Sequence, residues 1–289
     1  SGPPRASGRR AFVRRLREGA GGLSGDLKRG VALALEPTRR ADDGARTTHL
    51  VVCGYPRSGS TLLQQMLEHG DVPVRGFQGE VEAMDALDAR APDGRLVTKH
   101  PDDVLEIERI AGARRDAGGQ ARFVFTVRDP RDVMTSRHQA YSAERGYYVE
   151  PERFVRTTRA LLAARERSDG VVVRYEDLVE DTARVSDRIA ALTHWPLASG
   201  FGDWYQRAER ATRDSMTEGA LGGLRRPEPG GVARWKAPEH HDRIARLVAT
   251  CPMLLEAVTA LGYEPDDTWA DAWRDTSTRA PVASTASSS

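Results

Sequence analysis

A glycine-rich loop with one arginine and three small hydroxyl side chains is the part of this chain best suited to bind an anion. It reads Gly54-Tyr55-Pro56-Arg57-Ser58-Gly59-Ser60-Thr61 and lies between an apolar run and a stretch with apolar residues at helical spacing. The start of a helix offers unpaired backbone N–H groups and the positive end of the helix dipole, so phosphate binds there readily. Gly59 allows close approach of the backbone, while Arg57, Ser60 and Thr61 add charge and donors. An ordinary strand–turn–helix connection is the alternative.

The loop is close to the Walker A pattern G-x-x-x-x-G-K-[ST], but Ser60 stands where that pattern has lysine. In kinases and NTPases this lysine contacts the β- and γ-phosphates. The sequence therefore disfavours an ATP or GTP hydrolase and favours a phosphate-bearing ligand that another basic group binds.

A second basic segment follows a later apolar run, at residues 123–133, with Ser136 one helical turn further on. Pro130 suits the first position of a helix. Arg128 stands at the carboxyl end of the run, where ligands bind in doubly wound sheets. Asp132 is expected to cap the helix or pair locally. Alone, the sequence RDPRD is also compatible with a capping and salt-bridge cluster.

These two segments together resemble the donor-binding motifs of sulfotransferases that use 3′-phosphoadenosine 5′-phosphosulfate (PAPS). Arg128 and Ser136 resemble the family's 3′-phosphate pair. Residues 55–63 resemble its 5′-phosphosulfate loop, which implies donor contacts from Arg57, Ser58, Gly59, Ser60, Thr61 and Leu62. The resemblance also implies that Arg57 neutralises charge on the leaving phosphate. Leu62 departs from the adenine-stacking tryptophan of many cytosolic aryl members.

Two further segments agree with this resemblance, which covers roughly residues 48–262. Residues 171–178 match the family's RYEDL strand end, which implies a place near the adenine for Tyr175 and structural roles for the acids. Residues 230–236 are similar to the late G-x-x-G-x-W-K loop, which implies donor contacts from Arg234, Trp235 and Lys236. Ala233 replaces the second glycine of that loop, and Glu228-Pro229 replaces a frequent Arg-Lys, for which Arg225 and Arg226 are possible substitutes.

Sulfuryl transfer requires an activated acceptor and positive charge on the departing phosphate. The resemblance assigns Lys99 to the sulfuryl oxygens. Two residues compete for the role of base. Glu80 lies in a stretch similar to tyrosylprotein sulfotransferases, whereas His100 follows Lys99 directly and so departs by one residue from the K-T-H motif of aryl members. Glu80 is preferred, although a carboxylate base needs a pKa raised by burial. No metal is expected.

The elements that must position these residues are four apolar runs: 49–55, 95–99, 121–127 and 171–174. They are continuous rather than alternating, which is typical of parallel strands buried on both faces. Helical spacing between them, around Leu62–Leu67, Val104–Ile110, Val133–Tyr141 and Phe154–Ala164, predicts a three-layer, P-loop-type α/β domain over residues 47–275. Its part after Thr182 is expected to be helical. Residues 1–46 are interpreted as a basic, partly disordered arm, and 276–289 as a disordered tail.

Composition and net charge limit the classes of molecule that this protein is expected to bind. The net charge of +1 gives no global field that would attract nucleic acid. Two cysteines, no apolar stretch near the ~20 residues that span a bilayer, and no signal segment predict a cytoplasmic protein without integral membrane contact. Of 43 basic residues 40 are arginine, which suggests a bacterium with GC-rich genes. A small-molecule, lipid or sugar acceptor is expected, and the oligomeric state stays open.

Three hypotheses follow. The first is a PAPS-dependent sulfotransferase that acts on a hydroxyl group. The second is a P-loop kinase of a small metabolite, against which Ser60 argues. The third is a catalytically silent nucleotide-binding module.

Overall fold

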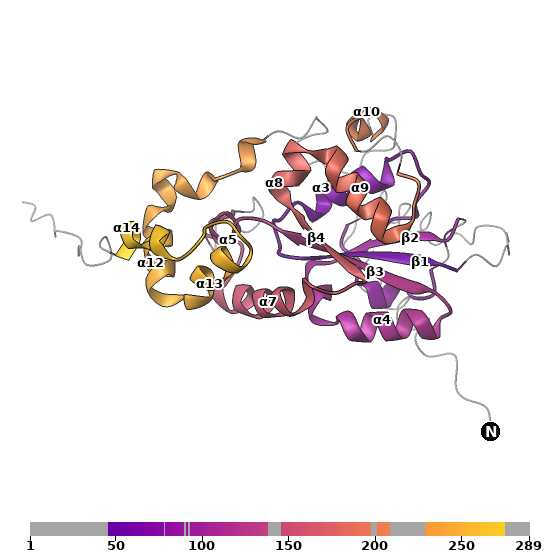
Figure 1. Ribbon diagram of the computed structural model, residues 1–289, viewed down its shortest axis with the longest axis horizontal. Helices are drawn as coiled ribbons and strands as arrows, with labels where there is room; N and C mark the ends of the chain where they lie inside the picture. Colours follow the sequence, from indigo (N-terminus) through magenta and orange to yellow (C-terminus); the bar gives the residue numbers. More distant parts are fainter. Residues whose placement is uncertain are drawn as a thin grey trace, which may run out of the picture.

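Four parallel strands form one sheet at the centre of the molecule (Figure 1). The computed structural model describes residues 46–77, 79–89, 91, 93–137, 146–197, 201–208 and 229–274. The strands stand in the order β2-β1-β3-β4. Their bounds are β1 Thr48–Gly54, β2 Arg95–Lys99, β3 Gln120–Val127 and β4 Gly170–Arg174. All four predicted strands are confirmed, and so is the predicted three-layer α/β class.

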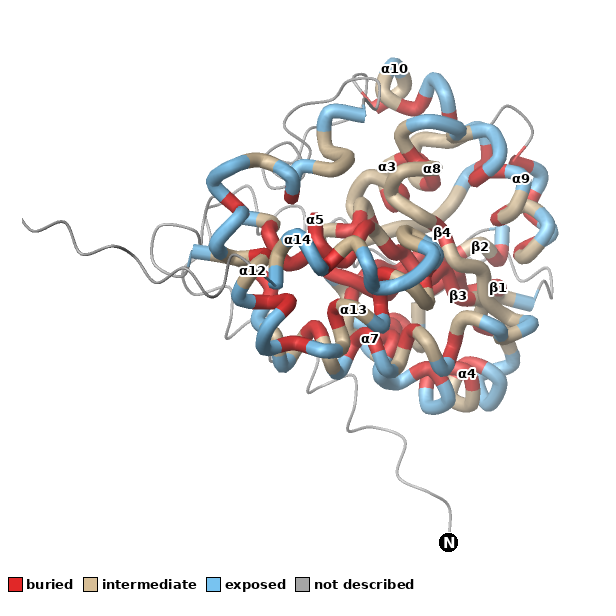
Figure 2. Tube along the Cα trace, turned by 60° about the vertical axis from the view of Figure 1, so that its left-hand side comes forward, coloured by how far each residue is buried: buried red, intermediate tan, exposed pale blue. Residues whose placement is uncertain are grey.

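Every residue of β1 is buried, because helices cover both faces of the sheet. Leu50 and Val52 pack on one face and Val51 and Cys53 on the other. The first face is covered by α3 Ser60–Glu68, α8 Tyr175–Glu180, α9 Thr182–Thr193 and α10 Trp204–Ala208. The second is covered by α4 Ile107–Asp116, α7 Pro151–Ala164 and α13 Pro252–Ala260. Figure 2 shows the buried strands between these partly exposed helices.

The C-terminal part is helical, as predicted, and lies at one end of the sheet in Figure 1. Besides α13 it contains α12 His241–Thr250 and α14 Asp271–Arg274. Short 3₁₀ helices precede or follow them: η4 Pro229–Gly231, η5 Arg234–Lys236, η6 Pro238–His240 and η7 Thr268–Ala270. A small cluster around Trp235, Ile244 and Val248 holds this part together.

Two predicted helices are shorter in the structure. The apolar residues from Val104 to Ile110 belong to a 3₁₀ helix, η3 Pro101–Leu105, and to α4, with Glu106 between them at φ −125°. After β3, α5 Pro130–Met134 covers only the start of the predicted helix Val133–Tyr141: residues 135–137 are not helical, and residues 138–141 lie outside the described residues. The C-cap residue of α5, Thr135, donates its hydroxyl to the carbonyl of Arg131 at 2.8 Å, the kind of local bond that often bends helices.

The predicted N-terminal arm before residue 46 and the predicted tail lie outside the described residues. Within the ranges that the structure describes, helices of sufficient length and apolarity to cross a bilayer are absent.

Candidate functional site

The loop between β1 and α3 has a backbone that requires glycine. Gly54 has φ +128°, and a Cβ there would lie 2.3 Å from the carbonyl oxygen of Thr126 on β3. Arg57 and Gly59 also adopt left-handed φ values, 65° and 84°. These turns bring the chain into α3 at Ser60. The first-turn N–H groups of a helix have no acceptor within the helix, so the loop offers them to an anion.

The hydroxyl groups of this loop point in different directions. Ser58 is fully buried, and its Oγ donates to the carbonyl of Tyr55 and to Thr126 Oγ1 at 2.7 Å. The predicted donor contact of Ser58 is therefore limited to its backbone N–H. Thr61 Oγ1 accepts a hydrogen bond from Lys99 Nζ at 3.3 Å. Leu62 is half-buried against the apolar cluster that covers α3.

The two basic segments meet at Arg57. Its Nε donates to Ser136 Oγ at 3.2 Å, and Arg128 Nη1 donates to the Arg57 carbonyl oxygen at 3.1 Å. Burial and the neighbouring Arg128 charge lower the pKa of the Arg57 guanidinium. Among the described residues, Arg57 has no carboxylate in an ion pair with it, whereas Arg128 lies 3.4 Å from Asp132. Within the described ranges, the two neighbouring guanidinium groups thus have a single carboxylate between them, Asp132, in an ion pair. The positive charge that is left over favours binding of an anion.

Arg128 joins its own segment after β3 to the loop after β1, to the start of α8 and to the loop at residues 230–236. Its guanidinium lies 4.6 Å from the ring centroid of Tyr175, and Nη2 donates to the carbonyl of Gly231. Its buried Nε has no hydrogen-bond partner within the described part of the chain. Tyr175 is enclosed by glycines: a Cβ at Gly59 would lie 2.8 Å from its ring, and one at Gly231 would lie 2.4 Å from its hydroxyl.

Asp132 holds the loop at residues 230–236 beside Arg128. Asp132 pairs locally with Arg128, as expected, and its Oδ1 also accepts the backbone N–H of Trp235 at 2.8 Å, a contact with a distant segment. Ala233 adopts φ 56°, a left-handed conformation that favours glycine. Arg234 and Lys236 are exposed.

The indole of Trp235 belongs to the C-terminal cluster. It is buried and packs beneath the guanidinium of Arg131, 4.1 Å from its ring centroid, in the C-terminal cluster with Trp269 and Trp273. Arg131 also pairs with Asp129 and Glu264. Near Arg128, Trp235 therefore contributes its backbone N–H group, and the indole anchors the loop to the C-terminal helices.

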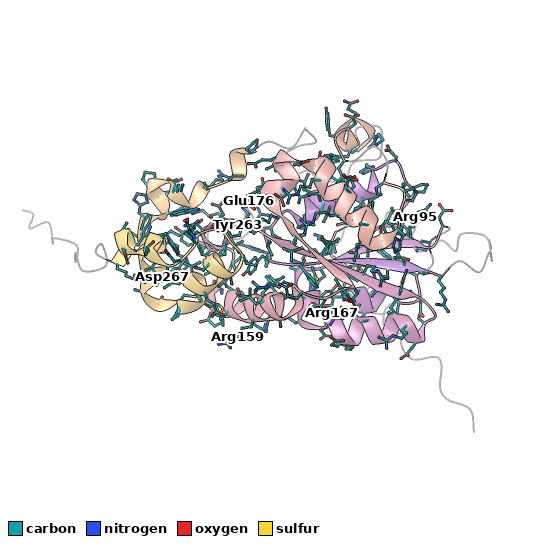
Figure 3. The ribbon with its side chains drawn as sticks, in the orientation of Figure 1. Arg95, Arg159, Arg167, Glu176, Tyr263 and Asp267 are labelled. Carbon is teal, nitrogen blue, oxygen red and sulfur yellow. The ribbon has the colours of Figure 1, made fainter. Side chains whose placement is uncertain are left out.

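Glu176, the first of the two acids in the RYEDL segment, binds the backbone of the segment that follows β3. Glu176 Oε1 accepts the N–H of Asp129 at 3.2 Å, and Oε2 accepts the hydroxyl of Tyr263 at 3.0 Å (Figure 3). Burial raises the pKa of Glu176. These contacts connect α8 with the segment that follows β3 and with the C-terminal part.

Lys99 and Glu80 form an ion pair next to the phosphate loop. The Lys99 ammonium lies 3.1 Å from Glu80 Oε1, and its side chain is 4% exposed against 48% for Glu80. A buried ammonium held by a carboxylate that reaches solvent suits a site where an acceptor approaches from outside.

His100 points toward another carboxylate. Its Nδ1 lies 3.8 Å from Asp103 Oδ1 and has no hydrogen-bond partner among the residues described. Burial raises the pKa of Asp103 to about 7, and Asp103 Oδ2 accepts the N–H of Ala83 at 3.0 Å. The structure thus separates the two predicted bases: Glu80 contacts Lys99, and His100 faces Asp103.

Sequence reasoning missed Gln64 and Glu68 on α3. Burial raises the pKa of Glu68 to about 7, and Gln64 Nε2 donates to its Oε1 at 2.7 Å. The signal in the sequence was a glutamine–glutamate pair at spacing i, i+4, which commonly interacts on a helix. Groups of three or more potential metal ligands are absent from the described ranges.

Comparison with known proteins gives a partial match. Residues 77–199 match the model of a family described as "Sulfotransferase family". The matched span begins after the phosphate loop and includes Glu80, Lys99, Arg128, Ser136 and Tyr175. A comparison with curated protein sequences finds no match.

Solved structures with a similar fold include three sulfotransferases. The sulfotransferase domain of the Synechococcus PCC 7002 olefin synthase is 17% identical, with a TM-score of 0.48, over 70% of this chain and 92% of that one. A mouse sulfotransferase complexed with PAP is 14% identical, with a TM-score of 0.49, over 76% and 90%. The sulfotransferase domain from the curacin biosynthetic pathway is 16% identical, with a TM-score of 0.46, over 76% and 99%.

Proposed function

We propose that this chain, whose residues 77–199 belong to the sulfotransferase family, transfers a sulfuryl group from PAPS to a hydroxyl of a small-molecule, lipid or carbohydrate acceptor. Adenosine 3′,5′-bisphosphate (PAP) is the second product. The observation that carries the proposal is the contact between the two basic segments. Arg57 Nε bonds to Ser136 Oγ and Arg128 bonds to the Arg57 carbonyl, so the groups suited to two phosphates lie in one site.

The residues present fit a donor with phosphates at both ends of an adenosine. The start of α3 with Arg57, Ser60 and Thr61 suits the 5′ phosphosulfate, because it combines N–H groups, charge and hydroxyls. Arg128, whose buried Nε lacks a partner in the described structure, and Ser136 suit the 3′ phosphate. Arg234 and Lys236 are exposed on the loop that Arg128 contacts and add positive charge.

Each side chain then has a defined task. PAPS supplies the activated sulfuryl group when bound. Glu80 accepts the proton of the acceptor hydroxyl: its carboxylate lies beside Lys99 and is half exposed, so an acceptor can reach it, although the burial expected of a carboxylate base is absent. The buried Lys99 ammonium is placed to stabilise negative charge that develops in the transition state, and the Arg57 guanidinium to stabilise charge on the leaving phosphate.

A binding comparison tests the proposal. The protein is titrated with PAP and with 5′-AMP, and the same titrations are repeated with Arg128→Ala. We expect PAP to bind at least about tenfold more tightly than 5′-AMP, and the preference to disappear in the variant, because charge-assisted bonds to the 3′ phosphate are lost. Equal affinities with no loss in Arg128→Ala would contradict the proposal.

Activity distinguishes the remaining alternatives. Candidate acceptors are screened with labelled PAPS, with and without magnesium and ATP. Transfer of label to a hydroxyl acceptor supports the proposal. Magnesium-dependent ATP turnover would instead indicate a kinase, and tight PAP binding without transfer to any acceptor would indicate a silent nucleotide-binding module.

A further inference from the structure

Glu80 lies in a short segment that runs from Arg75 to Val81. Backbone hydrogen bonds join this segment to β2 at both ends. At its start, the N–H of Arg75 donates to Arg95 O at 2.9 Å, and the N–H of Val97 donates to Arg75 O at 2.8 Å. At its end, the N–H of Val81 donates to Lys99 O at 3.1 Å. Backbone bonds to β2 therefore fix the two ends, and the position of Glu80 also depends on what holds residues 76 and 77.

Helix α3 holds this middle part through one glutamine. Gln64 Nε2 donates to the carbonyl of Phe77 at 2.5 Å and to Glu68 Oε1 at 2.7 Å. Gln65 Nε2 donates to the other oxygen, Glu68 Oε2, at 3.2 Å. The Glu68 carboxylate thereby orients Gln64, and Gln64 in turn binds the segment three residues before Glu80.

The same carboxylate packs directly on the backbone of Gly76. A Cβ built on Gly76 would lie 1.8 Å from Glu68 Oε1 and 2.4 Å from Glu68 Cδ. The φ of Gly76 is outside the left-handed region, so space rather than backbone conformation requires glycine here. Hydrogen bonding at Phe77 and close packing at Gly76 thus join α3 to the segment.

Charge links Glu68 to the ion pair of the site. Burial raises the pKa of Glu68 to about 7, whereas the hydrogen bond from Gln64 and the positive charge of Lys99 act in the opposite direction. Lys99 Nζ also bonds to Glu80 Oε1 and to Thr61 Oγ1 of α3. The ammonium of Lys99 therefore contacts the half-exposed carboxylate of Glu80 and also feels the charge of the partly buried carboxylate of Glu68.

We propose that Gln64 and Glu68 are positioning residues for the proposed base: they hold Gly76-Phe77 against α3 and so keep the Glu80 carboxylate beside Lys99. This inference rests on the proposed function, in which Glu80 accepts the proton. Neither residue is placed in contact with the acceptor or the donor, so they act through the segment that they hold.

One added methyl group tests the proposal. Gly76→Ala places a Cβ where Glu68 Oε1 lies and should displace the segment. Gly112→Ala on α4 is the matched control, because a Cβ there meets nothing within 4 Å. The double variant Gly76→Ala/Glu68→Asp shortens the acid by one methylene and should make room for the methyl group while it keeps a carboxylate.

Four measurements are made on the full chain: amide hydrogen exchange at Val81, melting temperature, PAP affinity, and kcat and KM with labelled PAPS and the best acceptor of the screen. In Gly76→Ala we expect exchange at Val81 to rise, and kcat to fall, by about tenfold or more, because the segment opens locally. PAP affinity should stay within about twofold, since the donor groups are untouched. The double variant should recover part of both losses.

Other outcomes overturn the proposal. It fails if Gly76→Ala behaves like Gly112→Ala in exchange and kcat. It also fails if kcat, PAP affinity and melting temperature fall together without recovery in the double variant, because that pattern indicates general misfolding. Absence of PAP binding and of transfer in the unmodified protein would refute the proposed function instead, while exchange at Val81 would still report whether α3 holds the segment.

Discussion

Arg57 Nε lies 3.2 Å from Ser136 Oγ, although 79 residues separate them in the chain. One residue belongs to the loop after β1 and the other to the segment after β3, and β1 and β3 are neighbours in the sheet. The carboxyl ends of adjacent parallel strands meet at one edge, where ligands bind in folds of this kind. The bond therefore makes the two basic segments interdependent.

This dependence predicts non-additive effects of substitution. Ser136→Ala removes a hydroxyl and also releases the Arg57 side chain, while Arg57→Lys removes the Nε donor. Each single variant should weaken PAP binding by about 1–2 kcal/mol, and the double variant should lose less than the sum, because both changes break one interaction. Isothermal titration of the four proteins measures the coupling. Strict additivity would show that the two side chains act separately.

The separation of Glu80 from His100 predicts which residue is the base. Glu80→Gln keeps the size of the side chain but cannot accept a proton, so kcat should fall by about 10²–10⁴-fold with little change in PAP affinity. His100→Ala should lower kcat far less, since its ring faces Asp103. Steady-state kinetics with labelled PAPS compares the two. A larger loss in His100→Ala would reverse the assignment.

The buried Asp103 predicts a pH-dependent contribution to stability. Burial, its largest cause, raises the pKa of this carboxyl to about 7, above the ordinary value of 3.8. Between those values the folded state binds more protons than the unfolded state, so this contribution to the free energy of unfolding falls as pH rises from about 4 to 7. Asp103→Asn cannot ionise.

The free energy of unfolding of Asp103→Asn should therefore gain on that of the unmodified protein between pH 5 and pH 8, by at most about 3 kcal/mol. Urea unfolding at several pH values measures the difference. Asp102→Asn on the same 3₁₀ helix is the control, because it removes a neighbouring charge that pairs at the surface with Arg153. The prediction is contradicted if the difference in free energy of unfolding between Asp103→Asn and the unmodified protein does not increase with pH.

Ala233 predicts a stabilising substitution. It adopts φ 56°, which costs a residue with a Cβ roughly 1–2 kcal/mol. Ala233→Gly should raise the free energy of unfolding by up to about 1 kcal/mol, after allowance for the greater freedom of glycine in the unfolded chain. Ala237, at φ −66°, is the control: its change to glycine should lower stability. Thermal unfolding measures the stability of both variants. Equal changes in stability for Ala233→Gly and Ala237→Gly would contradict the prediction.

The sequence predicted the sheet well because parallel strands that are buried on both faces have a simple pattern. Four continuous apolar runs became four strands, with bounds that differ by at most one residue. The resemblance to donor-binding motifs also predicted that Arg57 and Arg128 lie in one site, and Arg128 Nη1 contacts the Arg57 carbonyl oxygen. Helix ends were less predictable: α5 ends at Met134, where the hydroxyl of the C-cap residue Thr135 bonds to the carbonyl of Arg131, and no sequence pattern marked this end.

Other contacts between distant segments could not be read from the sequence. Trp235 matched a donor-binding motif, but its ring packs beneath Arg131, because an apolar indole is more stable in the cluster with Trp269 and Trp273. The packing of Gly76 on Glu68 has no sequence pattern either, since a glycine required only for space looks like any other loop glycine. Such roles depend on three-dimensional neighbours.

The contact of Arg128 with Gly231, 103 residues later in the chain, has a consequence for synthesis on the ribosome. Domains form progressively as the chain emerges, at about 5–20 residues per second. The strands and the phosphate loop emerge well before residues 231–235, which close around Arg128 and Asp132. A nascent chain should therefore gain its full affinity for PAP only several seconds after its sheet is complete.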